Sequence, residues 1–478
     1  MTTIIDALNT FFWGYVLIYV LLAVGVFFTI RLGFLQFRHF PEFFRSVLRA
    51  PATDKSGITP IQALCTSLAS RVGTGNLAGV AVAITLGGPG AIFWMWMVAL
   101  VGMATAYSES TLAQLFKVRT ESGEFRGGPA FYIAKGLNAP WAATIFSICL
   151  ILTFGLVFSA VQANSIADAT LGAFGVPKLA TGVVLALISG VVIFGGIKRI
   201  AQIAEWVVPF MAGAYLLMAL YVIGNNLSEV PAVLATIVKS AFGLEEAVGG
   251  IAGAMLNGIK RGLFSNEAGM GSAPNIAAVA VANPHHPSSQ GLVQALGVFI
   301  DTLLICTATA LMILLSGVVA SPELTGIHLT QAAMSDHIGG AGTYFIAIAI
   351  FFFAFTSIIG NYTYAENAMV YLKLNNRAGL TVLRTLALLM VVWGAYASVA
   401  TVFDAADAAM GLMATINLVA ICLLSGLVAK LTRDYFAQNR EGTPALNLTD
   451  YPELAGKIDQ EIWGEQPATA AHVLGSKA

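Results

Sequence analysis

The sequence predicts an all-α, polytopic membrane protein with about 11 transmembrane helices. Three observations predict this class: 57% of the residues are hydrophobic, only 10% are charged, and the mean hydropathy is +0.80. Soluble domains carry roughly 25% charged residues, and a helix needs about 20 apolar residues to cross a hydrocarbon core. The net charge of −1 excludes the basic excess that a nucleic-acid-binding protein would show.

Eleven apolar segments follow one another along the chain. They cover about 9–30, 60–86, 91–117, 139–166, 178–197, 203–225, 245–282, 289–318, 341–372, 379–400 and 406–431. We expect four parts: an extra N-terminal helix with a cytoplasmic loop (1–59), two groups of five helices (60–230 and 231–431), and a polar cytoplasmic tail (432–478) that extends into solvent.

Lys and Arg side chains predict the orientation, because they accumulate in cytoplasmic loops. Nineteen of them fall in alternate loops and in the tail, and only Lys178 and Lys239 fall on the other side. The remaining three, Arg71, Lys260 and Arg261, lie inside apolar segments. This bias predicts a multi-pass protein of the cell membrane with its N-terminus outside and its C-terminus in the cytoplasm.

Segment two is interrupted by glycine. Gly73, Gly75 and Gly79 fall within seven residues, next to Arg71 and Asn76. Each glycine costs roughly 1 kcal/mol of helix propensity relative to Ala, and irregular backbone in a bilayer is tolerated only where it is buried in protein or lines a cavity. The pattern predicts a discontinuous helix, with close helix packing through small residues as the alternative.

Segment seven has a similar interruption at residues 258–269. Its first half, residues 245–258, is expected to be a helix of about 20 Å, and its second half to resume near Ala268. The loop that follows holds His285 and His286 beside prolines, without metal-ligand spacing, and is expected to be solvated.

The two interrupted segments are five apart and enter the membrane from opposite sides. Such a pair predicts inverted five-helix repeats and a substrate site near the midplane of a secondary transporter. Half-helix N-termini favour a carboxylate, and unwound carbonyls favour a small cation such as Na⁺.

Five short stretches carry a family resemblance. They are residues 73–76 (GTGN), 87–96 (GGPGAIFWMW), 127–129 (GGP), 161–165 (VQANS) and 261–269 (RGLFSNEAG). Together they resemble the alanine/glycine:cation symporter family, the sodium:alanine symporters, over about residues 10 to 435. The resemblance implies an inner-membrane symporter with an amino acid-polyamine-organocation-like fold, in which segments two and seven are the discontinuous helices.

The resemblance also implies a sodium site between the first break and segment nine. The carbonyl groups of Ala69, Val72 and Phe353 and the hydroxyl groups of Thr356 and Ser357 would be its ligands. The alternative for a Thr-Ser pair in a membrane helix is a hydrogen bond to its own backbone.

By the same resemblance the substrate site lies at the two breaks and on segments four and nine. Its expected residues are Gly73, Thr74, Gly75, Asn76, Gln162, Phe264, Ser265, Asn266 and Asn361. Gln162 has an interhelical hydrogen bond as its alternative role. Asn361 departs from the bulky aromatic residue that some family members have, and a smaller residue would widen the pocket.

Several buried charges have no assigned ligand. Arg71 either binds a carboxylate or pairs with Glu267 or Asp301. Acids inside membrane segments are candidate functional residues; for Glu109 and Glu366, at predicted cytoplasmic helix ends, we expect gating or structural pairing. Lys260 and Arg261 are expected at the mouth of the second break.

These observations predict Na⁺-coupled symport of a small neutral amino acid, alanine or glycine, by alternating access. A sodium-coupled carrier of glutamine or of a broader set of neutral amino acids is the alternative, and an amino-acid channel is a weaker one. No nucleophile–base pair, metal cluster or cofactor motif predicts an enzyme. The expected partners are the amino acid, Na⁺ and membrane lipids, without nucleic acid or an organic cofactor, and a monomer is expected.

Overall fold

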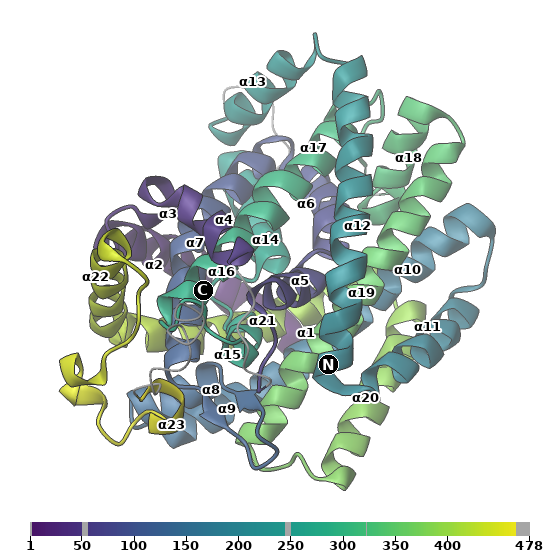
Figure 1. The fold of residues 1–478 in the computed structure, drawn as a ribbon. Coiled ribbons are helices and arrows are strands. Elements are labelled where there is room, and N and C mark those ends of the chain that lie inside the picture. Colours follow the sequence, from purple (N-terminus) through teal and green to yellow (C-terminus); the bar gives the residue numbers. More distant parts are fainter. Residues whose placement is uncertain (1, 50–55, 244–249, 322, 465–478) are drawn as a thin grey trace, which may run out of the picture.

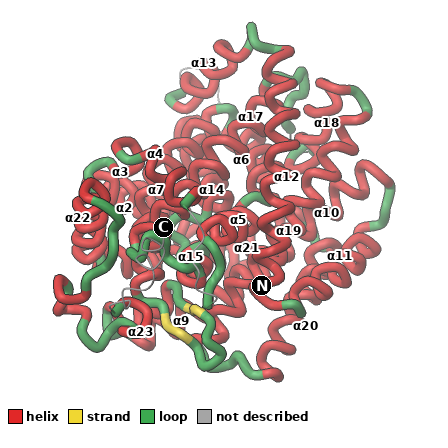
Figure 2. The backbone as a smooth tube through the Cα atoms, in the orientation of Figure 1, coloured by secondary structure: helices red, strands yellow, loops and turns green. Residues whose placement is uncertain are grey.

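The computed structural model describes residues 2–49, 56–243, 250–321 and 323–464, and the chain is mostly helical there (Figures 1 and 2). The predictions made for Lys55, for the start of segment seven (245–249) and for the end of the tail (465–478) fall outside these residues.

The α-helices are α1 (Thr2–Phe11), α2 (Leu17–Arg31), α3 (Leu35–Arg38), α4 (Phe40–Leu48), α5 (Pro60–Arg71), α6 (Val80–Gly87), α7 (Gly90–Leu115), α8 (Pro129–Phe131), α9 (Pro140–Leu150), α10 (Ser159–Phe174), α11 (Lys178–Ile193), α12 (Gly196–Asn225), α13 (Val230–Ala241), α14 (Gly250–Asn266), α15 (Pro274–Val279), α16 (Ser288–Val298), α17 (Thr307–Leu314), α18 (Gly326–Ile338), α19 (Ala341–Tyr371), α20 (Arg377–Tyr396), α21 (Val399–Leu423), α22 (Ser425–Glu441) and α23 (Gln460–Trp463). Short π-helical turns are η1 (Phe12–Val16), η2 (Gly75–Gly79), η3 (Tyr132–Gly136), η4 (Ile151–Phe158) and η5 (Phe299–Cys306), and η6 (Leu448–Asp450) and η7 (Pro452–Leu454) are 3₁₀ turns. Two strands, β1 (Val118–Arg119) and β2 (Phe125–Arg126), form one antiparallel hairpin.

Within the described residues, eight helices are long and apolar enough to cross a membrane. They coincide with predicted segments one, three, four, six and eight to eleven, which confirms a multi-pass helical membrane protein. The predicted bounds of the last segment, 406–431, were wrong. The apolar helix α21 begins at Val399 and ends at Leu423, and the polar helix α22 then starts at Ser425.

The core is built around α7, which packs along α14 and α16. Small residues allow close approach elsewhere too: a Cβ on Gly394 of α20 would lie 2.3 Å from the carbonyl oxygen of Ala160 on α10. Lipid tails are as apolar as the side chains, so the hydrophobic effect does not hold membrane helices together. Close backbone packing of this kind stabilises helix pairs instead. Figures 1 and 2 place α13 at one end of the bundle and α8, α9 and α23 at the other.

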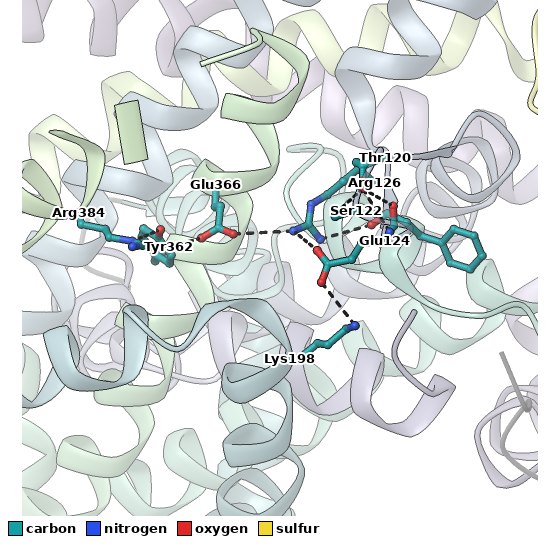
Figure 3. Close-up of polar contacts among 9 residues, drawn as sticks. Thr120, Ser122, Glu124, Arg126, Lys198, Tyr362, Glu366 and Arg384 are labelled. Atoms are coloured by element: carbon teal, nitrogen blue, oxygen red, sulfur yellow. Dashed lines mark hydrogen bonds and ion pairs between the residues drawn. The ribbon is translucent and has the colours of Figure 1, made fainter. Parts of the chain in front are cut away.

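A chain of ion pairs joins the hairpin to the three helices α12, α19 and α20 (Figure 3). Arg126 on β2 lies between Glu124, at 3.0 Å, and Glu366 on α19, at 3.8 Å. Lys198 of α12 contacts Glu124 at 3.5 Å, and Arg384 of α20 contacts Glu366 at 3.9 Å. Glu366 therefore has the structural pairing that was one of its two predicted roles.

The first part of the tail does not extend into solvent, which corrects the sequence-based expectation for residues 442–464. Trp463 is 1% exposed, and its indole N–H donates to the carbonyl oxygen of Leu115 at 3.0 Å. The Lys117 ammonium lies 5.4 Å from the Trp463 ring centre, and the His285 ring lies 4.9 Å away. An apolar anchor inside a polar segment thus docks the tail beside the end of α7.

His286 was predicted to be solvated, and it is fully buried instead. Its Nδ1 accepts the backbone N–H of Ser288 at 3.1 Å, and its Nε2 faces Asp434 of α22 at 3.5 Å. Burial lowers the pKa of His286, although Asp434 opposes this shift. Burial alone would raise the pKa of Asp434, but hydrogen bonds from His286, Gln438 and Tyr451 lower it to about 2.

These shifts predict that acidification loosens α22 and the tail. A histidine with a lowered pKa contributes its full stability above the ordinary value of 6.5 and loses it as the pH falls below that value. Asp434 loses its contribution only below its ordinary 3.8. At pH 5.5 the loss from His286 is up to about 1.4 kcal/mol, so we expect proteolysis of the tail to accelerate up to about tenfold relative to pH 7.5. A His286→Gln variant removes the titration and serves as the control; equal acceleration in both proteins would contradict the prediction.

Candidate functional site

The first helix break lies between α5 and η2. A capping box of Thr59 and Gln62 starts α5, and the helix ends at Arg71 because Val72 is extended, with ψ of 94°. A Cβ on Gly73 would lie 2.3 Å from Ser357 Oγ and 2.6 Å from Gln162 Oε1. Only glycine therefore lets the backbone approach α10 and α19 this closely, and the predicted break is confirmed here.

The backbone N–H groups of this break are bonded by neutral amides. Gly73 donates to Asn76 Oδ1 and Thr74 donates to Gln162 Oε1, each at 2.8 Å. The Thr74 hydroxyl is fully buried and has no hydrogen-bond partner among the residues that the structure describes. The break thus presents two polarised N–H groups and a hydroxyl in a region screened from solvent.

Four of the five predicted sodium ligands lie together. Ser357 Oγ is 3.4 Å from the carbonyl oxygen of Val72 and 3.0 Å from that of Phe353. The Thr356 hydroxyl donates to the same Phe353 oxygen at 2.9 Å, so both hydroxyls make the hydrogen bond to their own helix backbone that was the alternative role of this pair. Ala69 is fully buried on α5, three residues before Val72. Hydroxyl and carbonyl oxygens of this kind are ligands that hard cations prefer.

The second break begins later than predicted. The helix α14 runs without interruption to Asn266, so the expected stop at Gly258 was wrong. Gly258 and Gly262 serve close packing instead, since a Cβ there would lie 2.3 Å from the Ala91 carbonyl oxygen and 2.5 Å from Val98 on α7. The chain then turns through residues 267–273, with Gly269 and Gly271 at positive φ, before α15 begins at Pro274.

Glu109 of α7 holds the second break. Its two carboxylate oxygens accept the backbone N–H groups of Gly269 and Gly271, each at 3.2 Å. The Asn417 side chain donates to the same carboxylate at 2.7 Å. The prediction of a structural role for Glu109 therefore agrees with the contacts, although its partners are backbone amides of the break.

Asp301 joins the first break to the last turn of α14 and was not among the predicted site residues. Its Oδ1 accepts from Asn76 Nδ2 and its Oδ2 from Ser265 Oγ, both at 2.7 Å. Thr302 also donates to Oδ2, at 2.7 Å. A lone acid in an apolar segment was the only signal in the sequence for this residue.

Phe264 closes the site on the α14 side. A Cβ on Gly75 would lie 3.2 Å from the Phe264 ring and 3.0 Å from the Cα of Ser265. The ring packs against Phe158 of η4 with the two ring planes tilted by 41° and 4.7 Å between ring centres. Together with Asp301 these contacts gather seven predicted substrate residues around the first break: Gly73, Thr74, Gly75, Asn76, Gln162, Phe264 and Ser265.

The two other predicted substrate residues lie toward the second break. Asn266 Oδ1 accepts the backbone N–H of Ala268 at 3.0 Å and so caps the end of α14. Asn361 Oδ1 lies 2.5 Å from Ser70 Oγ, and this hydroxyl also contacts Glu267 at 2.9 Å. The Nδ2 atoms of both asparagines are buried and have no hydrogen-bond partner in the described part of the chain.

Arg71 is buried at the end of α5, 2% exposed. Its Nη1 donates to the carbonyl oxygen of Gln294 at 3.1 Å, in a space left open by Gly297. No carboxylate of the described residues lies within 4.0 Å of it, so the predicted ion pair with Glu267 or Asp301 is not formed.

Comparison with known proteins identifies similar carriers. The model of the sodium:alanine symporter family matches residues 1–447. The amino-acid carrier protein AlsT of Bacillus subtilis is 49% identical, with 98% of this chain and 99% of the relative covered. The probable sodium/glutamine symporter GlnT of the same organism is 48% identical (92% and 91%), and the sodium/alanine symporter AgcS of Methanococcus maripaludis is 40% identical (91% and 97%).

Gly73 tests the geometry of the first break. A Gly73→Ala change forces Ser357 and Gln162 apart, and overpacking of this size costs about 1–3 kcal/mol. We expect amino-acid binding, measured by calorimetry on purified protein, to weaken at least about tenfold. Gly79→Ala is the matched control, because its Cβ would meet nothing closer than 3.6 Å. Equal binding by the two variants would show that Gly73 does not shape the site.

Proposed function

The chain belongs to the sodium:alanine symporter family, and from this premise we propose that it imports a small neutral amino acid together with Na⁺ by alternating access. The family is one of transporters, so the protein is a carrier and not an enzyme. Alanine or glycine is the proposed substrate, bound at the first break.

The observation that carries this proposal is the difference between the two breaks. The N–H groups of Gly73 and Thr74 are bonded by neutral amide oxygens, whereas those of Gly269 and Gly271 are bonded by the Glu109 carboxylate. Hydrogen bonds from N–H groups to the ionised carboxylate of a substrate are roughly twice as strong as those to neutral amide oxygens. A substrate carboxylate can therefore replace Asn76 and Gln162 at the first break, while Glu109 already supplies a carboxylate at the second.

The positive end of the substrate has a matching group. Asp301 is fully buried and contacts Asn76 and Ser265, one residue from each discontinuous helix. An ammonium group is costly to bury without a partner of opposite charge. We assign Asp301 as the acid that offsets this charge, with the carboxylate and the ammonium of one amino acid held between the two helices.

Sodium coupling is proposed to use Val72, Phe353, Thr356 and Ser357, with Ala69 as the fifth ligand. Val72 belongs to the first break, Ala69 to α5, and the other three residues to α19. Because Ser357 is also next to Gly73, a cation there would order the backbone that receives the substrate. This contact couples occupancy of the ion site to occupancy of the substrate site.

A glutamine carrier is the second candidate. Asn361 has an unpartnered amide donor near Ser70, and a relative 48% identical is named a probable sodium/glutamine symporter. A channel is disfavoured because both breaks are enclosed by buried side chains, which suits a site opened to one side at a time.

We also propose the membrane arrangement. The helices of 60–230 and 231–431 form the two inverted repeats, residues 1–59 add the N-terminal helix, and the tail is cytoplasmic. The excess of Lys and Arg in alternate loops supports an outer N-terminus.

Removal of both hydroxyls tests the sodium site. In proteoliposomes with an imposed Na⁺ gradient, a Thr356→Ala, Ser357→Ala variant should need at least about tenfold more Na⁺ for half-maximal alanine uptake, since two oxygen ligands are lost. Uptake should be electrogenic, because Na⁺ brings one net charge along with a neutral amino acid. One charge moving across 100 mV is worth about 2.3 kcal/mol. Thr363→Ala on the same helix, whose hydroxyl bonds the Gly360 carbonyl, is the control; an unchanged Na⁺ response in the double variant would refute the assignment.

Asn361 tests the choice between small and longer substrates. Asn361→Ser removes the free Nδ2 donor and keeps a hydroxyl beside Ser70. If this donor binds a glutamine side chain, the glutamine concentration that halves labelled alanine uptake should rise about tenfold in the variant. Its affinity for alanine should stay unchanged. Competition that is the same in both proteins would place Asn361 outside the pocket.

A further inference from the structure

Two cations of α14 share one carboxylate on α21. The Lys260 ammonium lies 2.6 Å from Asp407 Oδ2, and Arg261 Nη2 lies 2.5 Å from the same oxygen. Asp407 is 1% exposed, and its Oδ1 has no hydrogen-bond partner among the described residues. The Trp13 indole N–H donates to the Asp407 carbonyl at 3.1 Å, which fixes this turn of α21.

Arg261 is the under-satisfied member of this cluster of Lys260, Arg261 and Asp407. Its side chain is 4% exposed, and its Nε and Nη1 are buried without a hydrogen-bond partner in the described part of the chain. Its guanidinium lies over the rings of Phe403 and Phe264, 5.0 and 5.7 Å from their centres. A buried charged group with unmade hydrogen bonds is costly, so these donors favour an added acceptor.

The cluster adjoins the proposed substrate site. Phe264, on which the guanidinium rests, would contact a Cβ on Gly75 at 3.2 Å. A single aromatic ring therefore separates Arg261 from the first break. Lys260 also rests on the Trp13 ring, 5.6 Å from its centre.

The charges of the cluster favour an anion. Two cations face one close acid, and a further acid, Asp404, lies one turn away on α21 and is exposed. A planar guanidinium with two free N–H donors fits a carboxylate in two-point contact. Every neutral amino acid carries such a carboxylate.

We propose that Arg261 binds the carboxylate of the amino acid before it reaches the first break, in a staging site formed with Phe264 and Phe403. The inference rests on the proposed function and names a second contact for the same substrate. Asp407 competes with the arriving carboxylate for Arg261. It holds the guanidinium in place when no substrate is near, and some of the Arg261–Asp407 hydrogen bonding is replaced when a substrate arrives.

Opposite effects of the two partners distinguish this role from a structural ion pair. If Arg261 and Asp407 only brace two helices, loss of either side chain damages uptake in the same direction. If Arg261 receives the substrate, Arg261→Gln raises the KM for external alanine, whereas Asp407→Asn removes the competitor and lowers it.

The test is Na⁺-driven uptake of labelled alanine into intact cells, with expression and thermal melting of each purified variant as checks on folding. We expect Arg261→Gln to raise KM about tenfold or more with a smaller change in kcat, and Arg261→Lys to restore only part of the affinity, because the charge returns but the two-point contact does not. Asp407→Asn should lower KM about threefold. Lys178 pairs with Asp168 and lies outside the cluster, so Lys178→Gln should leave KM unchanged.

Two outcomes would overturn the inference. An unchanged KM in a folded Arg261→Gln protein would show that the guanidinium does not meet substrate, and equal KM increases in Arg261→Gln and Asp407→Asn would assign a structural pair. If Asp407→Asn fails to fold, a raised KM in an Arg261→Gln protein whose thermal melting is unchanged decides for the substrate contact, and a KM rise that comes with lowered melting decides against it. Wild-type cells without Na⁺-driven uptake of alanine, glycine or glutamine would instead contradict the proposed function.

Discussion

Satisfaction of backbone hydrogen bonds is the constraint on which the rest of this structure depends. Hydrocarbon offers no partner for a free N–H or C=O, so an interrupted helix must find one within the protein. The two breaks find different partners. Asn76 and Gln162 bond the first with neutral amide oxygens, and Glu109 bonds the second with a carboxylate. At the second break two backbone N–H groups converge on the single Glu109 side chain, which Asn417 on α21 anchors further. At the first break two separate amide side chains fill this role, and a substrate carboxylate, a stronger acceptor than a neutral amide, can replace them.

Hydropathy predicted most of the helices, because apolar length is a local property of the chain. Eight of the eleven segments became long apolar helices at nearly the predicted positions. The position of the second break was not predictable in the same way. Gly258 and Gly262 look like helix breakers in sequence, yet they lie in a regular helix and allow α14 to touch α7. The residues that do break the chain, Gly269 and Gly271, differ from them in backbone φ, which depends on the Glu109 contact from another helix.

Long-range partners explain the remaining differences at the site. Gly73, Gln162 and Ser357 were expected together because the family resemblance placed them at one break, and their contacts agree with that expectation. Asp301 was missed because its partners Asn76 and Ser265 lie 225 and 36 residues away. His286 appeared solvated because its neighbours in sequence are polar or proline, whereas α22 covers it with Asp434 and Tyr435. Sequence pattern therefore located the first break and its polar character, and tertiary contacts decided where the second break begins and which acids serve both.

The distribution of buried charge gives the proposed carrier a direction. Glu109, Glu267, Asp301 and Arg71 are all buried at or beside the two breaks. Lys260 and Arg261 face a single close acid on the other side of Phe264. A zwitterion arriving past Phe264 thus meets excess positive charge first, which attracts its carboxylate, and the buried acid Asp301 second, whose oxygens can accept its ammonium. Because uncompensated charge is costly at low dielectric, a substrate carboxylate at the first break also favours a bound Na⁺ beside it. On this view the cation is needed for the electrostatic balance of the loaded site, which is the physical basis for coupling its movement to that of the amino acid.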